Sequence, residues 1–97
     1  MPGLTITTTL TDGTETITAI GDVDGATAAQ LRAAIAAAAG ARIVVDLTAS
    51  SYFDKSGLRV LLEFTGKLSE VVVLRNGAVQ RLFALVALDQ VLPIRVV

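Results

Sequence analysis

The chain has 97 residues, of which 53% are hydrophobic and 18% charged, and its formal net charge is −1. This composition predicts one globular domain over residues 1–97, and the small net charge argues against direct nucleic-acid binding. The chain has no cysteine and no histidine, which excludes a disulfide framework, a Ser-His-Asp triad and a histidine-ligated metal within it. Because no apolar stretch reaches the ~18 residues of a membrane span and no signal-peptide pattern is present, we expect a cytoplasmic protein with no membrane contact and no cofactor.

The first two predicted elements form a hairpin. Apolar residues and threonines alternate over 4–10, and the alternation resumes over 15–20, which is typical of strands that bury one face. The Asp12-Gly13 pair between them is a strong signal for a tight turn. We therefore predict an antiparallel hairpin with a threonine-shielded edge strand. The Gly/Asp-rich segment 21–25 is expected to end its second strand.

A helix is predicted next. Thr27 and Gln30 fit a capping box, in which the threonine side chain caps the helix and the glutamine reaches back. Gly40 is well placed to end the helix. The face expected to be buried consists of Ala28, Leu31, Ile35 and Ala38.

The rest of the chain alternates between strands and helices. The apolar runs 43–47 and 71–74 predict buried strands, and 94–97 predicts a terminal strand. Two helices are expected, one from about Ser56 to Gly66 and one capped by Asn76. Their buried stripes are predicted to be Leu58, Leu61, Leu62 and Thr65, widened by Val60 and Phe64, and then Val79, Leu82, Phe83 and Val86, with Leu85 and Leu88 off the stripe.

Residues 48–53 are predicted to be a polar connection. Tyr52 and Phe53 are neighbours in it and should point in opposite directions, with Tyr52 at the surface and Phe53 in the core. The resulting order is β-β-α-β-α-β-α-β, which predicts an α/β fold with a single mixed sheet covered by helices. The domain has no internal repeat or linker.

Ser56 is the residue at which chemistry is most plausible. We expect it at the N-cap or first position of its helix, where Asp54 or Ser56 itself could simply cap free backbone N–H groups. Alternatively, Ser56 accepts a phosphate, which a helix N-terminus tolerates. A phosphate would add about −1.5 to −2 charges to a face that also carries Asp54, Asp22 and Asp24, and so would repel a docked partner. Asp46, at the end of its strand, is expected to be a hydrogen-bonding residue and not a catalytic acid.

The order of these motifs resembles the STAS domain of bacterial anti-sigma factor antagonists. That family has a strand ending in aspartate, a short loop, and then Asp-Ser-Ser-Gly-Leu or Asp-Ser-Thr-Gly-Leu at the start of a helix. The matching segments here are Asp46, Asp54-Lys55-Ser56-Gly57-Leu58, Gly21-Asp22-Val23-Asp24, 27–31 and 85–93. The resemblance covers almost the whole chain and implies a SpoIIAA-like fold.

The resemblance also implies a function. In the family, an anti-sigma factor kinase phosphorylates the serine or threonine before the glycine, and the unphosphorylated protein binds the anti-sigma factor and so releases sigma. That position is Ser56. The partners implied are an anti-sigma factor serine kinase and a PP2C-type phosphatase, with the chain a monomer or weak homodimer. The residues expected to contact the partner are Asp22, Asp24, Ser51, Tyr52, Asp54, Lys55, Gly57 and Arg59.

Lys55 departs from the pattern, since the family commonly has a small residue there. It is either a solvated side chain or a cation that pairs with phosphorylated Ser56. A second interpretation is a STAS accessory subunit that is not phosphorylated and binds a partner constitutively in a transport or stressosome-type complex. An enzyme using Asp46, Asp54 and Ser56 is disfavoured, because the chain lacks a general base near pH 7, a metal site and a glycine-rich phosphate loop.

Overall fold

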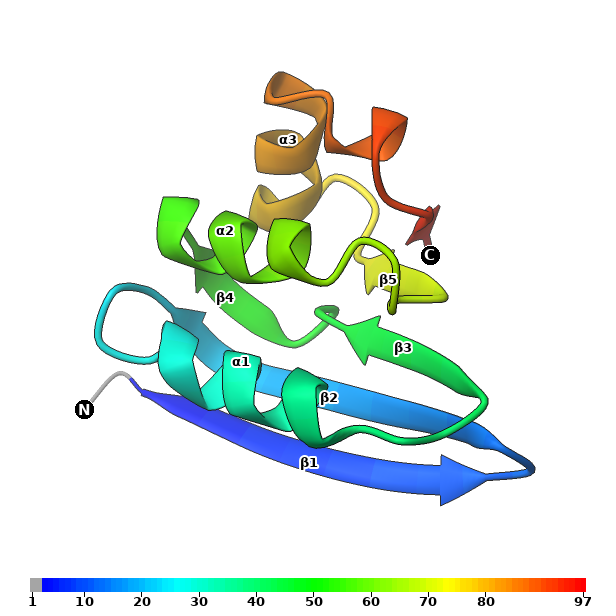
Figure 1. Cartoon of the computed structure of the whole chain (residues 1–97). Helices are drawn as coiled ribbons and strands as arrows, with labels where there is room; N and C mark the ends of the chain where they lie inside the picture. Colours follow the sequence, from blue (N-terminus) through cyan, green and yellow to red (C-terminus); the bar gives the residue numbers. More distant parts are fainter. Residues whose placement is uncertain (1–2) are drawn as a thin grey trace.

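The computed structural model describes residues 3–97 and has an α/β fold with one mixed sheet (Figure 1). Its elements are β1 (Leu4–Thr11), β2 (Thr14–Val23), α1 (Ala28–Ala37), β3 (Arg42–Asp46), β4 (Ser50–Phe53), α2 (Lys55–Glu63), β5 (Glu70–Val73), α3 (Ala78–Leu85), the 3-10 turn η1 (Leu88–Gln90) and β6 (Ile94–Val96). The sheet order is β1-β2-β3-β5-β6, and β4 pairs with β2. Helix α1 lies over β1 and β2 beside α2, and α3 packs on β4.

The predicted hairpin is confirmed. Strands β1 and β2 pair antiparallel from Leu4 opposite Gly21 to Thr11 opposite Thr14. The two turn residues, Asp12 and Gly13, both have positive φ angles of 51° and 82°, as a type I′ turn requires. Strand β1 is an edge of the sheet, as the sequence predicts.

Strand β3 is the predicted central strand. It pairs in parallel with β2 on one side and β5 on the other. Ile43 and Val45 belong to the main hydrophobic core under the helices, whereas Val44 is buried outside that cluster. A strand that buries both faces explains why its sequence shows no alternation.

The prediction of a polar connection over 48–53 is wrong for its last four residues, because Ser50–Phe53 forms strand β4. Strand β2 also does not stop at Gly21 but continues through an irregularity at Gly21 and Asp22 to pair with β4 in parallel. Gly21 has a φ of 108°, and a methyl group there would lie 2.2 Å from the backbone oxygen of Gly3. A glycine is thus required where β2 bends to receive β4.

The helices bury mostly, but not always, the predicted faces. The stripe of α1 is confirmed, with Leu31 and Ile35 fully buried. In α2 the buried residues are Gly57, Val60 and Leu61, whereas Leu62 is 45% exposed and Thr65 is exposed. The helix turns its Gly57 side toward the core, and a glycine adds nothing to a hydrophobic pattern.

Both ends of α3 also differ from the prediction. Its N-cap is Gly77, and Asn76 precedes it with a φ of 61°. Helix α3 stops at Leu85, so Val86 is left 47% exposed. The left-handed conformation of Ala87 then redirects the chain, and Leu88, predicted to lie off the buried stripe, is 3% exposed.

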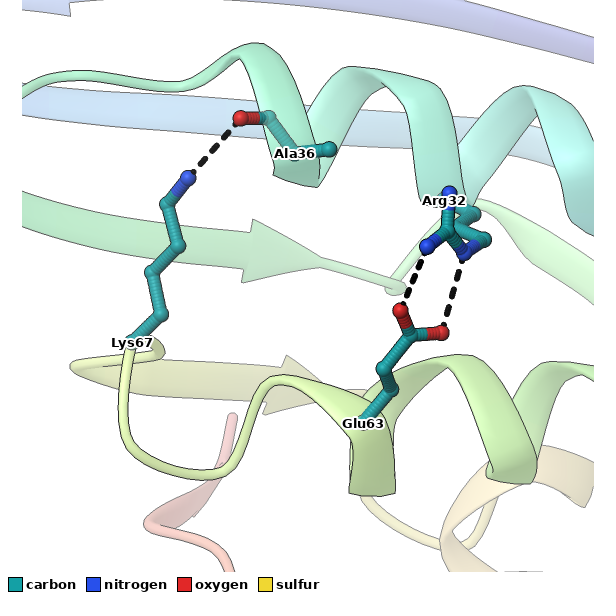
Figure 2. A network of polar contacts seen from close by, with 4 residues as sticks. All are labelled: Arg32, Ala36, Glu63 and Lys67. Atoms are coloured by element: carbon teal, nitrogen blue, oxygen red, sulfur yellow. Dashed lines mark hydrogen bonds and ion pairs between the residues drawn. The ribbon is translucent and has the colours of Figure 1, made fainter.

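Polar contacts join α1 to α2 at the surface (Figure 2). The Arg32 guanidinium donates to both carboxylate oxygens of Glu63, at 3.0 and 2.6 Å, and Lys67 Nζ donates to the backbone oxygen of Ala36 at 3.0 Å. The hydrogen bond and the charge of Glu63 raise the pKa of Arg32 above its usual value. Both cations also lie about 6 Å from the Phe64 ring centroid. Exposed pairs of this kind contribute little stability.

Candidate functional site

The start of α2 lies where β2 and β4 end side by side. Val23 is opposite Phe53 in the parallel pairing, and the N–H of Asp54 donates to the oxygen of Val23 at 3.1 Å. The loops that follow β2 and β4 therefore open at the same edge of the sheet. We call this region the Ser56 surface, which consists of Asp22, Asp24, Ser51, Asp54, Lys55 and Ser56.

Asp54 is the N-cap of α2. Its Oδ1 accepts a hydrogen bond from the N–H of Ser56 at 2.8 Å, and its backbone oxygen accepts the first helical bond from Leu58. Lys55 and Ser56 are then the first and second helical residues. The expectation that Ser56 occupies the N-cap or first position is therefore wrong by one residue, and Asp54 is the cap.

Because the side chain of Asp54 caps α2, the hydroxyl of Ser56 is not needed as a helix cap. Within residues 3–97, no hydrogen bond involves Ser56 Oγ, and the residue is only half-buried. Its nearest neighbour across the surface is the β2–α1 loop, where a methyl group at Gly25 would lie 3.7 Å from Ser56 Oγ. The hydroxyl therefore lies between the start of α2 and the β2–α1 loop and can take part in chemistry without breaking a hydrogen bond.

The three acidic residues near Ser56 have different surroundings. Asp22 Oδ1 accepts a hydrogen bond from Ser51 Oγ at 2.9 Å, across the β2–β4 pairing. Asp24 Oδ1 accepts from the N–H groups of Ala26 and Thr27, at 2.9 and 3.1 Å, and so shapes the loop next to Ser56. Together with the Asp54 cap, these carboxylates make the surface acidic.

The predicted capping box at the start of α1 does not form. The hydroxyl of Thr27 accepts from the N–H of Asp24 at 3.0 Å and donates to the oxygen of Asp22 at 2.8 Å, and no side-chain cap bond from Thr27 exists. The side chain faces back into the loop because Asp24 already binds the local amides. Thr27 therefore stabilises the loop that borders Ser56.

The other residues that were predicted to contact the partner differ in how exposed they are to solvent. Lys55 and Arg59 are exposed, and Tyr52 is 51% exposed while Phe53 is 7% exposed, as predicted for the two aromatics. Gly57, by contrast, is buried. A methyl group at Gly57 would lie 2.6 Å from Cζ of Phe53, so the structure assigns this residue to packing.

Sequence reasoning missed one nearby feature. A cavity of about 170 Å³ adjoins the Ser56 surface and shares Ser51 with it. Its walls come from the segments after β3 and β5, from β4 and from the start of α3. The lining residues are Leu47, Thr48, Ser50, Ser51, Leu74, Gly77, Ala78 and Val79.

Asp46 is a hydrogen-bonding residue at the strand end, as predicted. Its Oδ1 accepts from both the N–H and the hydroxyl of Thr48, at 2.9 and 2.7 Å. The carboxylate thus holds the turn that leads to β4. In the part of the chain that the structure describes, no cluster of acidic residues suitable for a metal ion occurs, and no helix has the length and hydrophobicity needed to cross a bilayer.

The cap geometry yields a direct prediction for stability. Asp54→Ala should lower the free energy of unfolding by about 1 kcal/mol, because the N–H of Ser56 loses its acceptor. Asp54→Asn should retain most of that stability, since the amide oxygen can still accept the bond. Chemical denaturation of the two variants and of Ser56→Ala measures this, and a loss in Ser56→Ala as large as that in Asp54→Ala would contradict the assignment of the cap.

Comparisons with a protein-family model and with solved structures agree with the α/β fold described above. The family model described as "Mlab, STAS domain" matches residues 6–94. A search of curated proteins finds no match. Among solved structures, an anti-sigma factor antagonist from Mycobacterium paratuberculosis is similar with a TM-score of 0.85 and 27% identity, over 95% of this chain and 85% of that one.

Two further structures share the fold at lower identity. Unphosphorylated SpoIIAA, an anti-sigma factor antagonist, has a TM-score of 0.63 and 20% identity over 96% of this chain and 87% of its own. A Shewanella loihica protein with a SpoIIAA-like fold has a TM-score of 0.61 and 15% identity over 100% and 87%. Since the family model covers nearly all of the sequence, the chain belongs to the STAS domain family.

Proposed function

We propose that this protein is an anti-sigma factor antagonist that is switched off by phosphorylation of Ser56. The observation that carries the proposal is the hydroxyl of Ser56, half-buried at the second position of α2 and engaged in no hydrogen bond within residues 3–97. The similarity to the mycobacterial structure described as an anti-sigma factor antagonist supports the same function. The protein then acts as a binding module and not as an enzyme.

The phosphate transfer requires a partner to supply the catalytic groups. Ser56 Oγ attacks the γ-phosphorus of ATP, a new O–P bond forms, and the bond from that phosphorus to the β–γ bridging oxygen breaks to release ADP. The proton of the hydroxyl passes to a base on the kinase, since this chain has no histidine. A PP2C-type phosphatase would hydrolyse the phosphoserine and restore the hydroxyl.

Electrostatics explain how the phosphate would act. The N-terminus of α2 favours an anion at Ser56, so the fold tolerates the modification. The added charge of about −1.5 to −2 joins Asp22, Asp24 and Asp54 on one surface. A partner that has to desolvate this surface would then meet strong repulsion. Lys55 is exposed and adjacent in sequence, where it can reduce the repulsion only in part.

Three exposed side chains close to Ser56 in the sequence are candidate partner contacts. Tyr52 offers a large aromatic side chain that is 51% exposed, and Lys55 and Arg59 are exposed cations on α2. Aromatic and arginine side chains often dominate the affinity of protein interfaces. We therefore propose that the anti-sigma factor contacts these residues together with the Ser56 surface.

Phosphorylation is tested directly by incubation with candidate anti-sigma factor kinases. The wild-type protein, incubated with the cognate kinase and ATP, should gain a single phosphate by intact-mass spectrometry, and Ser56→Ala should gain none. Ser51→Ala is the control for the site of modification, because Ser51 is the other serine of the Ser56 surface, and it should still gain one phosphate.

Two results would count against the switch. Phosphate found on Ser51, or on both variants equally, would contradict the assignment of Ser56. Binding of the kinase without any phosphate transfer would favour the other interpretation, a STAS accessory subunit that binds its partner constitutively.

A further inference from the structure

Strand β1 is a sheet edge that only uncharged side chains shield. It is eight residues long, it is the outermost strand next to β2 (Figure 1), and most of its side chains are exposed. Its sequence, LTITTTLT, contains no charge and no proline. Such edges present free N–H and C=O groups to any strand that can pair with them, and proteins usually block them.

The opposite edge of the sheet is blocked in three ways. Strand β6 has only three residues, it follows Pro93, and it carries Arg95, which forms an ion pair with Glu70 at 3.0 Å. Short length, a nearby proline and a charge are common devices against edge pairing. The contrast shows that β1 lacks the protection present elsewhere in the same sheet.

The pairing with β2 fixes which backbone groups of β1 point outward. Gly21 is opposite Leu4. The N–H of Gly21 donates to the backbone oxygen of Ala49 and so points away from β1. Gly3 instead accepts a hydrogen bond from the N–H of Asp22 at 2.9 Å. Because the two kinds of pair alternate along antiparallel strands, the groups that point to the free edge belong to Leu4, Ile6, Thr8 and Leu10.

We propose that two copies of this chain associate by pairing their β1 strands antiparallel, which joins two sheets into one. Antiparallel pairing about a two-fold axis is self-complementary, since each strand offers the same groups to the other. The strand is uncharged, so its approach to a second copy involves no like-charge repulsion. This inference is independent of the proposed function of Ser56.

The side chains select the register. With Thr7 on the two-fold axis, Leu4 lies opposite Leu10 of the second copy and Ile6 opposite Thr8. Leu10 is 66% exposed in the single chain, and this register covers it with another leucine. A shift that places Thr8 on the axis would instead put Leu4 opposite the charged Asp12, so the first register is favoured.

The register makes a cysteine experiment specific. On the axis, Thr7 faces its own copy in a non-hydrogen-bonded pair, in which Cα atoms are about 4.5 Å apart, within the range of a disulfide. The chain has no native cysteine, so Thr7→Cys should form a covalent dimer under mild oxidation. Thr5→Cys alone should not, whereas an equal mixture of Thr5→Cys and Thr9→Cys should, since these two positions face each other.

Sedimentation equilibrium tests the association without cross-linking. The average mass of the wild type should rise with concentration from 10.0 kDa toward twice that value, and Leu10→Lys should weaken the association at least about tenfold. Leu85→Lys is the matched control, because Leu85 is 83% exposed on α3, and it should associate like the wild type. A wild type that stays monomeric at millimolar concentration, or Thr7→Cys that cross-links no faster than Thr5→Cys, would overturn the proposal.

Discussion

Replacing Gly57 by alanine is expected to lower the free energy of unfolding by about 1–3 kcal/mol, the usual cost of overpacking a core. The added methyl group would lie 2.6 Å from Cζ of Phe53, which is far inside van der Waals contact. Phe53 cannot easily move away, because it is 7% exposed and its ring packs edge-on against Phe83 at a centroid distance of 5.5 Å. Helix propensity acts in the opposite direction, since alanine is favoured over glycine by about 1 kcal/mol inside a helix. A net loss would therefore show that the contact with Phe53 dominates.

Two controls isolate the contact between Gly57 and Phe53. A methyl group at Gly66 meets nothing within 4 Å, so Gly66→Ala should change stability by no more than about 0.5 kcal/mol. In a Phe53→Leu background the smaller side chain leaves room, and Gly57→Ala should then cost less, with a coupling of about 0.5–3 kcal/mol. Urea denaturation of the four combinations gives the coupling. Gly57→Ala with wild-type stability or higher would contradict the packing role.

The role of Gly57 bears on the site, because it sets how closely the first turn of α2 approaches β4. Ser56 precedes Gly57, and its hydroxyl borders the loop at Gly25. A longer side chain at residue 57 would push the helix start away from Phe53 and change the position of Ser56. The same substitution should thus impair a function that depends on Ser56 even in molecules that remain folded.

Much of the fold could be predicted because its signals are local. Asp12 and Gly13 specify a two-residue turn, and the alternation on either side specifies which faces pair. The uninterrupted run at 43–47 identified the strand buried on both faces. The stripe of α1 was also visible, because Leu31 and Ile35 are large apolar residues at helical spacing.

Strand β4 could not be predicted because its signal is not local. It has four residues, of which only Phe53 is buried, so no alternation distinguishes it from a loop. Its pairing partner is the end of β2, about thirty residues earlier in the chain. That end exists only because Gly21 adopts a φ of 108°, and a glycine in a sequence more often indicates a break than a continuing strand.

The candidate site was predicted in outline and missed in detail for a related reason. The pattern Asp54-Lys55-Ser56-Gly57 located the start of α2, but two residues in it can act as a cap. Only the 2.8 Å contact from the N–H of Ser56 to Asp54 decides between them. Ser56→Ala should therefore cost little stability, since no cap bond is lost.

The largest functional effect is expected from a negative charge at residue 56. Ser56→Glu should bind the anti-sigma factor at least about tenfold more weakly than the wild type, which corresponds to about 1.4 kcal/mol. Its carboxylate would join Asp54 and Asp24 on the docking surface, where desolvation strengthens repulsion. Ser56→Ala should bind within a few-fold of the wild type and should not be released by kinase and ATP. Titration calorimetry with the purified anti-sigma factor measures all three affinities.

A matched charge just beyond the other end of α2 distinguishes a local effect from a change in net charge. Thr65 is exposed just beyond the opposite end of the helix, and Thr65→Glu adds the same carboxylate far from the Ser56 surface. It should bind like the wild type. Salt screens charges that stay solvent-exposed, so the difference in affinity between Ser56→Glu and Thr65→Glu should shrink at high salt only if the charge at residue 56 stays exposed in the complex. If both variants lose the same affinity, or if Ser56→Glu binds as tightly as the wild type, phosphorylation of Ser56 cannot work by repulsion.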